Sequence, residues 1–334
     1  MSSMIDDLLN PSSLPDKTVG VSLVQTHISS VIIADAFVYK IKKNVNFGFL
    51  DFSSLEKRHY YCQQEVKLNQ RLSEDLYIGV LPVFFDGEQY TLGKGSGDIV
   101  DYAVKMRKIP ENRIMKSVFE RGGLREEHLQ RIAQVLARFH QNARRSSEID
   151  GYGMPEIFRV NTDENFKQTK EYIDQTIEKD DFNDLRQWTD HFYIQKGDIF
   201  QERIDKGKIR DCHGDLHMEH ICLMEPLAVF DCIEFNERFR YSDTLADIAF
   251  LLMDLEFRGG KGFSEVLWDY YKALTGDEDA YELLRFYKVY RAYVRGKVNG
   301  FQLDDPHINH QEKQRAVEVA RRYFKLARSY IDER

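Results

Sequence analysis

The sequence predicts an α+β protein with two lobes, a small lobe built on an antiparallel β-sheet and a larger lobe that is mainly helical. Short apolar runs typical of strands dominate the chain as far as Pro110, and helical patterns dominate after it. One strand-like stretch interrupts the helices. The chain has 334 residues, which is enough for two domains. We therefore expect a lead-in over residues 1–18, the small lobe over 19–109 and the large lobe over 110–334.

The small lobe is expected to contain five strands and one helix. Apolar runs with short polar breaks are typical of β-strands, and they occupy four segments: residues 19–28, 29–45, 78–85 and 98–109. The second of these segments is long enough for two strands. Between the third and fourth expected strands, Leu55, Cys62 and Leu72 recur near helical spacing. This pattern predicts a helix there, with Ser53 or Ser54 as its N-cap.

The large lobe is expected to consist of amphipathic and apolar helices. The clearest covers residues 126–144, where Leu129, Ile132 and Leu136 share one face. The last expected helix is charged and ends at Arg334. Between these two, helical patterns recur in five segments: residues 165–177, 182–204, 243–260, 263–276 and 281–300.

The composition excludes several classes of protein. A formal net charge of -8 disfavours nonspecific binding to nucleic acid, which depends on neutralising phosphates. No run of eighteen apolar residues is present, and residues 1–17 carry acids where a signal peptide needs a basic start and an apolar core. Four cysteines do not make a disulfide framework in a chain of this length. We expect a cytoplasmic enzyme or binding protein with neither a nucleic-acid nor a membrane partner.

The stretch that interrupts the helices, RDCHGDLHMEHICLMEPLAVFDCIEF at residues 210–235, concentrates three histidines, three cysteines and several acids. The turn signal Glu225-Pro226 between two apolar runs predicts a β-hairpin. A two-residue turn at this point places His220 directly opposite Asp231. If the register slips by two, the pair become diagonal neighbours. In either register the two side chains are expected within about 5–8 Å, close enough to share one ion.

The first part of this stretch is expected to be a loop. Gly214 does not allow a helix to continue easily, so Asp215 is expected on a loop that enters the hairpin. The spacing of His213, His217 and His220 also superficially offers zinc ligands, but two histidines of a zinc-binding helix must share one helical face, and Gly214 argues against that. The nearby cysteines fall in apolar strands, where cysteine behaves as a small hydrophobe. A zinc site and a set of satisfied core groups remain as alternatives.

The segment HGDLHMEHI followed by VFDCIEF resembles the catalytic segment of the aminoglycoside phosphotransferase-like family, a branch of the protein kinase fold. Three further segments, VYKIKK, FGFLDFS and IEFNERFRYSD, are most similar to an uncharacterised bacterial group of that family. The resemblance covers approximately residues 20–300. It implies a bilobal protein kinase-like fold with a nucleotide-binding N-lobe, and a C-lobe that carries the catalytic loop and a metal-binding hairpin at 210–235.

The resemblance also implies the catalytic groups. Asp215 would be the base that accepts the proton of the acceptor hydroxyl or orients it, and Asp231 would bind the metal that bridges the nucleotide phosphates. Where the family has asparagine, this chain has His220. Mg²⁺ prefers oxygen ligands and imidazole suits softer ions such as Mn²⁺, so we expect Mg²⁺ or Mn²⁺ with neutral His220 as a second ligand. Activity would then fall as the pH drops through ~6.5. His213 and His217 are expected to support the loop.

The nucleotide phosphates also require a cation. By likeness to the family's third strand, Lys40 is expected to contact them and to pair with Glu65 on the helix. Lys42 alternates to the same face of the sheet and is the second choice, as Glu56 is for the helix glutamate. The alternative is that both lysines face solvent. Glu234, at the end of the hairpin, is expected to support the metal ligands or to bind a second metal.

Other parts of the nucleotide site follow the family less closely. The family's glycine-rich loop is missing, because THISS stands between the first two strands, and Ser29 or Ser30 is expected to contact phosphate with the backbone there. Backbone groups around Met106 and Arg107 are expected to pair with the purine edge. Asp247 is expected to brace the catalytic loop.

These residues predict a phosphotransferase that moves the γ-phosphate of ATP or GTP to a hydroxyl of a small molecule. The missing glycine loop and His220 favour an alternative, a weakly catalytic, pseudokinase-like module that binds nucleotide and acts through interaction. A zinc-dependent hydrolase is the third reading. Relatives in the group often carry a P-loop ATPase domain, and no G-x-x-x-x-G-K-[ST] occurs here, so a separate P-loop ATPase protein is a candidate partner.

Overall fold

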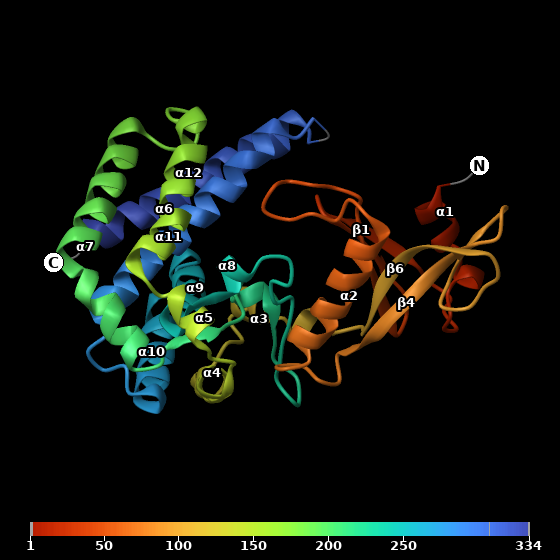
Figure 1. The fold of residues 1–334 in the computed structure, drawn as a ribbon, viewed down its shortest axis with the longest axis horizontal. Coiled ribbons are helices and arrows are strands. Elements are labelled where there is room, and N and C mark those ends of the chain that lie inside the picture. The colour runs from red at the N-terminus through yellow and green to blue at the C-terminus, as the bar shows by residue number, and fades with distance from the viewer. Residues whose placement is uncertain (1–2, 307, 333–334) are drawn as a thin grey trace. The chain divides into compact units, whose positions relative to one another are not determined.

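A computed structural model describes residues 3–306 and 308–332 (Figure 1). Across these residues, no helix is both long enough and apolar enough to cross a membrane. The expected charged helix at the C-terminus is α12 (His310–Asp332). Arg334, where this helix was expected to end, lies outside the described residues, as do the first two residues of the lead-in.

The contacts among its residues divide the chain into two compact units. Unit 1 takes in the chain up to Gly123 together with Glu219–Glu237, and unit 2 takes in Leu124–Met218 and the chain from Arg238 onward. The lobe boundaries expected from the sequence stay predictions. The contacts themselves group the residues between Pro110 and Gly123, and the hairpin, with the sheet.

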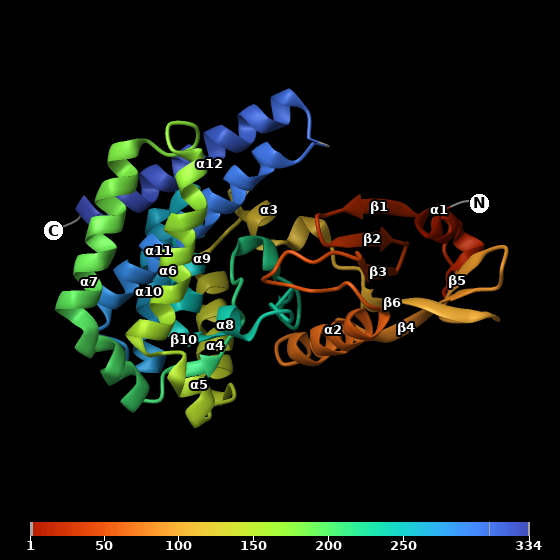
Figure 2. The same cartoon turned by 45° about the horizontal axis from the view of Figure 1, so that its top comes forward.

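Unit 1 is built on a six-stranded antiparallel sheet with the strand order β1-β2-β3-β6-β4-β5. Figure 2 shows β1, β2 and β3 lying side by side. Its strands are β1 (Ser22–Gln25), β2 (Ser29–Ile33), β3 (Phe37–Lys42), β4 (Tyr77–Phe85), β5 (Tyr90–Leu92) and β6 (Asp98–Arg107). The prediction of five strands was wrong by one. It missed β5, whose three residues are too few to show a pattern but pair with the end of β4 across a short turn.

The lead-in contains the short helix α1 (Met4–Leu8) and a 3-10 turn at Pro11–Ser13. Leu8 and Leu14 are buried in a core with Ile32 and other side chains of the sheet. The lead-in therefore packs as part of unit 1, because its apolar side chains cover one face of the strands.

The two faces of β3 have different environments. Tyr39 and Ile41 are buried in the apolar core on one face. Lys40 and Lys42 alternate with Tyr39 and Ile41 along the strand. Because successive side chains of a strand point to opposite faces, the two lysines point to the other face of the sheet. That second face is covered by a helix.

The covering helix is α2 (Leu55–Asn69), which lies along β6 in Figure 1. It begins at the N-cap Ser54, one of the two N-caps expected, whose hydroxyl accepts the N–H of Lys57. Cys62 is fully buried and packs with Tyr77 and Val104 of the sheet. Burial of this apolar side holds α2 against β4 and β6.

The predicted hairpin is present, but its predicted register was wrong. β8 (Ile221–Cys222) pairs with β9 (Ala228–Val229) so that Ile221 faces Val229. The connection is a five-residue loop with a cis peptide bond before Pro226, and the register differs by one residue from that of a two-residue turn. His220 therefore pairs with Phe230, whose N–H donates to the carbonyl oxygen of His220. When the register of a hairpin shifts by one residue, a side chain that was expected opposite a given residue normally points to the other face.

Unit 1 also contains α3 (Met115–Glu120), and unit 2 is mainly helical. A two-stranded antiparallel pair, β7 (Ile209–Asp211) with β10 (Tyr241–Asp243), flanks the loop that carries Asp215. The helices of unit 2 are α4 (Glu126–Asn142), α5 (Ser147–Gly151), α6 (Pro155–Thr169), α7 (Lys179–Asp205), α8 (Glu237–Arg240), α9 (Thr244–Phe257), α10 (Lys261–Thr275), α11 (Tyr281–Gly300) and α12. The first residue of α8, Glu237, belongs to unit 1.

The helix α9 lies in the middle of unit 2. Its residues from Thr244 to Leu255 are all buried, as expected for a helix that is apolar on every side. The carboxylate of its N-cap, Asp243, accepts the N–H of Leu245. α9 packs against α10 and α11, so Asp247 in its first turn is fixed within the core of the unit.

Candidate phosphotransfer site

A network of lysines and carboxylates lies on the face of β3 that α2 covers. Glu65 of α2 binds two lysines, with Lys40 Nζ at 2.9 Å from Oε1 and Lys42 Nζ at 2.6 Å from Oε2. Lys42 also pairs with Glu234. The expected pairing of Lys40 with Glu65 is thus present. The alternative of two solvent-facing lysines was wrong, because their side chains are only 15% and 1% exposed.

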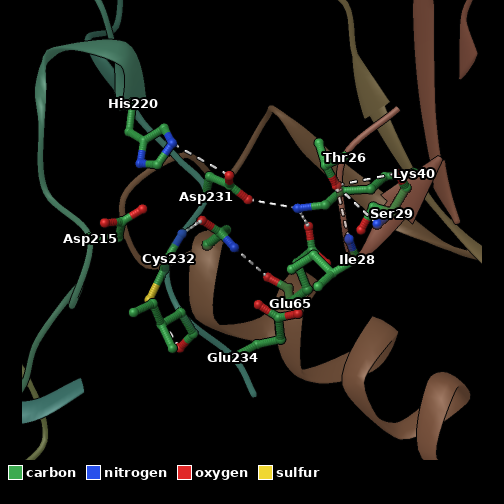
Figure 3. A network of polar contacts seen from close by, with 12 residues as sticks. Thr26, Ile28, Ser29, Lys40, Glu65, Asp215, His220, Asp231, Cys232 and Glu234 are labelled. Atoms are coloured by element: carbon green, nitrogen blue, oxygen red, sulfur yellow. Dashed lines mark hydrogen bonds and ion pairs between the residues drawn. The ribbon is translucent and has the colours of Figure 1, made fainter. Parts of the chain in front are cut away.

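Lys40 extends this network to the hairpin. Its Nζ lies 2.7 Å from Oδ1 of Asp231, and Oδ2 of Asp231 lies 3.4 Å from Nε2 of His220. Figure 3 shows His220, Asp231 and Lys40 joined in a row by dashed lines. His220 and Asp231 are neighbours despite the shifted register, because Asp231 has a φ of 61°. This left-handed backbone turns the chain directly after the hairpin and redirects the carboxylate.

Three residues that sequence reasoning missed hold this turn in place. The N–H of Asp231 donates to the hydroxyl of Tyr77 at 3.1 Å, and the N–H of Cys232 donates to Oδ1 of Asn69 at 2.8 Å. The hydroxyl of Ser73 donates to the carbonyl oxygen of Val229 at 2.7 Å. Asn69, 1% exposed, lies one turn after Glu65 on the buried side of α2. The sequence signal for this role of Asn69 was a polar amide side chain on the buried side of a helix, because such a group must find a hydrogen-bond partner.

Burial and charge act in opposite directions on the network. Burial acts to raise the pKa of Glu65, but Lys40 and Lys42 together hold it below its ordinary value. Burial raises the pKa of Glu234 above its ordinary value, although Lys42 opposes this effect. The pKa values of both lysines are raised despite burial, by Asp231 and Glu65 for Lys40, and by Glu234 and Glu65 for Lys42. The lysines are therefore firmly positive at neutral pH.

Asp231 and His220 suit a divalent cation. The side chain of Asp231 is 41% exposed although it is bound to Lys40, and that of His220 is 13% exposed. Because Oδ2 and Nε2 are 3.4 Å apart, one ion can contact both atoms. Carboxylate oxygen suits Mg²⁺ and imidazole nitrogen suits Mn²⁺. The ammonium group of Lys40 supplies the positive charge beside Asp231 in this structure.

The remaining residues expected at the nucleotide are placed as follows. Ser29 and Ser30 begin β2 and are 1% and 4% exposed. The N–H of Ser29 donates to the side chain of Thr26, and its own hydroxyl is buried without a hydrogen-bond partner in the described structure. Met106 and Arg107 end β6, and the N–H of Arg107 is bound to the carbonyl oxygen of Leu76. Because the N–H of Arg107 is already bound, a purine would have to form its hydrogen bonds with other backbone groups.

In unit 2, the loop with Asp215 is braced from α9. Asp247 is fully buried, and its two carboxylate oxygens accept the N–H groups of His213 at 2.7 Å and Gly214 at 2.8 Å. Burial acts to raise the pKa of Asp247, but hydrogen bonding from His140 and nearby positive charge lower it to about 2. The expected bracing of the loop by Asp247 is therefore present.

Three side chains complete the support of this loop. Nδ1 of His213 accepts the N–H of Asp215 at 3.3 Å, and Nε2 of His217 lies 3.5 Å from Oδ2 of Asp215. Arg291 of α11, only 5% exposed, donates to the carbonyl oxygen of Gly214 at 2.9 Å. In the sequence, Arg291 is one of four basic residues at helical spacing, with Arg285, Lys288 and Arg295. Its contact with the loop depends on how α11 packs against α9.

The comparisons with known proteins identify the family and the fold of this chain. The model of the phosphotransferase enzyme family matches residues 51–287. The chain belongs to the phosphotransferase enzyme family. An uncharacterised protein of Mycobacterium tuberculosis is 35% identical to it over 276 residues, which is 82% of this chain and 53% of that protein. The chain spans about half the length of the curated relatives it matches.

Solved structures share the fold at low identity. A choline/ethanolamine kinase family protein from Mesorhizobium loti has a TM-score of 0.50 and 13% identity, and the match covers 98% of this chain and 100% of that chain. The amicoumacin kinase hAmiN, solved with AMP-PNP, Ca²⁺ and Ami, has a TM-score of 0.51 and 11% identity over 95% of this chain and 89% of that chain. The predicted kinase-like α+β fold is confirmed.

Proposed function

We propose that this phosphotransferase moves the γ-phosphate of ATP or GTP to a hydroxyl group of a small molecule and needs a divalent cation, Mg²⁺ or Mn²⁺. The observation that carries the proposal is the contact of Lys40 with both Glu65 and Asp231. Protein kinases require a lysine paired with a helix glutamate, and an aspartate that holds the metal. This chain has both in one hydrogen-bonded network.

Each residue has a defined task in the proposed reaction. Lys40 binds the phosphates of the nucleotide, and Glu65 holds the ammonium group in position. Asp231 and His220 would hold the cation, which would supply positive charge against the phosphate oxygens. The carboxylate of Asp215 accepts the proton of the acceptor hydroxyl as that oxygen bonds to the phosphorus and the bond to the departing nucleoside diphosphate breaks. Ser29, Ser30 and backbone groups near Met106 and Arg107 remain candidates for contacts with the nucleotide.

Thermal melting with ATP or GTP, each with Mg²⁺ or Mn²⁺, tests the binding part of the proposal. A ligand at a hundred times its Kd adds ~2.7 kcal/mol of stability, which raises the Tm by several degrees in a chain of this size. We expect this shift in the wild type and its loss in Asp231→Asn and Asp231→Ala. Asp98→Asn, an exposed acid on β6, is the matched control and should keep the shift.

A second variant separates binding from chemistry. Asp215→Asn should retain the metal-dependent shift, while formation of nucleoside diphosphate in an acceptor screen falls by ~10²–10⁴-fold, the usual effect of a lost proton acceptor. Retained turnover in Asp215→Asn would contradict its role as the base. A wild type that binds nucleotide but transfers no phosphate would favour the nucleotide-binding interaction module. The comparisons lend no support to a P-loop ATPase partner, and the proposal does not include one.

A further inference from the structure

Unit 2 contains a pocket that is lined in part by His140, the side chain that contacts Asp247. The pocket holds about 190 Å³ of space, and a single water needs only about 10–15 Å³. The ends of α4 and α10, the start of α9, the chain between α7 and β7, and β7 itself line it. The lining residues are His140, Gln141, Lys206, Gly207, Lys208, Arg210, Thr244, Tyr271 and Thr275. The pocket is therefore large enough for a small ligand.

The charges that line this pocket are all positive. Arg210 donates to the carbonyl oxygens of Gly207 at 2.8 Å and Ala143 at 3.0 Å, and no carboxylate of the described residues forms an ion pair with it. Within residues 3–306 and 308–332, the ion-pair partner of Lys206 is Glu202, at 3.5 Å, and the Lys206 side chain is 62% exposed. These cations are available to an anion, and the guanidinium group can bind two oxygens of a phosphate at once.

The third cation is partly neutralised. Lys208 lies 3.1 Å from Asp277 and donates to the carbonyl oxygen of Thr275 at 2.7 Å. Asp277 is itself bound to Arg203, so this acid is shared between two cations. The pocket thus keeps an excess of positive charge, which favours a ligand with two negative charges over one with a single charge.

The inner wall of the pocket is connected to the loop with Asp215. The hydroxyl of Tyr271 lies 2.7 Å from Nδ1 of His140, and Nε2 of His140 lies 3.3 Å from Asp247. A carboxylate only accepts hydrogen bonds, so Nε2 carries the hydrogen and, in a neutral ring, Nδ1 accepts from Tyr271. Asp247 in turn accepts the N–H groups of His213 and Gly214. All these side chains are buried, so a group placed against His140 and Tyr271 is three hydrogen bonds from the loop.

We propose that this pocket is a second ligand site, for a small molecule bearing a phosphate group, and that the bound ligand stabilises the loop of Asp215 through Tyr271, His140 and Asp247. The ligand's phosphate binds Arg210 and Lys206. The site is distinct from the network around Lys40 and does not depend on the function proposed above.

Calorimetric titration with inorganic phosphate tests the site, with sodium chloride at matched ionic strength as the blank. We expect saturable binding to the wild type and at least tenfold weaker binding to Arg210→Gln. Lys206→Gln alters a side chain that is 62% exposed, and it should weaken binding several-fold. Lys170→Gln, an exposed lysine elsewhere in unit 2, is the matched control and should bind as the wild type does. Equal binding to the wild type and both pocket variants would overturn the proposal.

Phosphate can also bind at the nucleotide site, and Lys40→Gln distinguishes the two places. Binding that persists in Lys40→Gln and is lost in Arg210→Gln supports the pocket, whereas the reverse result overturns it and supports the nucleotide site instead. The link to the loop is tested by hydrogen exchange of residues 211–215. We expect saturating phosphate to slow exchange of the His213 and Gly214 amides at least threefold in the wild type and Lys40→Gln, and not in Arg210→Gln. Unchanged exchange in a protein that binds phosphate would overturn the coupling.

Discussion

Glu65 binds Lys40 with one carboxylate oxygen and Lys42 with the other. The two lysines differ in their other partners, because Lys40 reaches the half-exposed Asp231 while Lys42 reaches the buried Glu234. This arrangement assigns different tasks to two residues that the sequence places on one face of one strand. Lys42 neutralises two buried acids and keeps Glu65 in position. Lys40, whose side chain is 15% exposed, is the lysine proposed to contact the nucleotide.

Replacement of Lys42 by Met should therefore destabilise the protein far more than replacement of Lys40. Lys42→Met leaves Glu234 without its cation in the core, and loss of one partner of a buried ion pair typically costs about 3–5 kcal/mol. Lys40→Met leaves Glu65 paired with Lys42 and should lower the free energy of unfolding by much less. Urea denaturation at pH 7 measures both. The double variant Lys42→Met/Glu234→Leu should recover part of the loss, and equal losses in the two single lysine variants would contradict this account.

The anchoring of Asp231 by α2 predicts an effect of Asn69. Asn69→Leu removes the acceptor of the Cys232 N–H, and an unsatisfied buried donor costs about 1–3 kcal/mol. The same variant should weaken the nucleotide- and metal-dependent shift in Tm, because the backbone that positions Asp231 is loosened. Gln63→Ala, an exposed glutamine on the same helix, is the control and should behave as the wild type does. A stable Asn69→Leu protein with a full shift would show that the hairpin is held by other contacts.

The backbone of Asp231 predicts an order of stability among its own variants. A left-handed φ is easily adopted by glycine and costs other residues roughly 1 kcal/mol, with asparagine and aspartate least affected. Asp231→Gly should therefore be more stable than Asp231→Ala by about 1 kcal/mol, with Asp231→Asn closer to Gly than to Ala. All three lack the carboxylate, so none should show the metal-dependent shift. Chemical denaturation gives the order, and a more stable Ala variant would contradict the left-handed conformation.

Asp247 predicts a dependence of stability on acid. Its pKa is about 2 in the folded protein against an ordinary value of 3.8, so it contributes stability that is fully present above the ordinary pKa and lost as the pH falls from about 5 to 2. The contribution is about 2 kcal/mol. Asp247→Asn should be less stable at pH 7, and its free energy of unfolding should fall less steeply over this acid range. Urea denaturation at a series of pH values checks the slope, and parallel curves for the two proteins would refute the assignment.

Several features were predictable from the sequence because they depend on local spacing. Alternation along β3 places Lys40 and Lys42 on one face, and the helical pattern with Ser54 as its N-cap places Glu65 on α2. Gly214 predicted a loop at Asp215, and the turn signal Glu225-Pro226 predicted a hairpin after it; both are present. The catalytic roles of these residues stay predictions, as do the contacts expected of Ser29, Ser30, Met106 and Arg107 with the nucleotide.

The sequence by itself predicted five of the six strands of the sheet, the helix α2 and a mainly helical large lobe, since these follow from short-range patterns of apolar and polar residues. The kinase-like fold was predicted from the resemblance to a known family. Only the tertiary structure decided the hairpin register, the left-handed turn at Asp231 and the sharing of Glu65. Asn69 and Cys232 are 163 positions apart in the chain, and Lys42 and Glu234 are 192 apart. No local spacing encodes such contacts, because they arise only when distant segments pack and their buried polar groups must find partners.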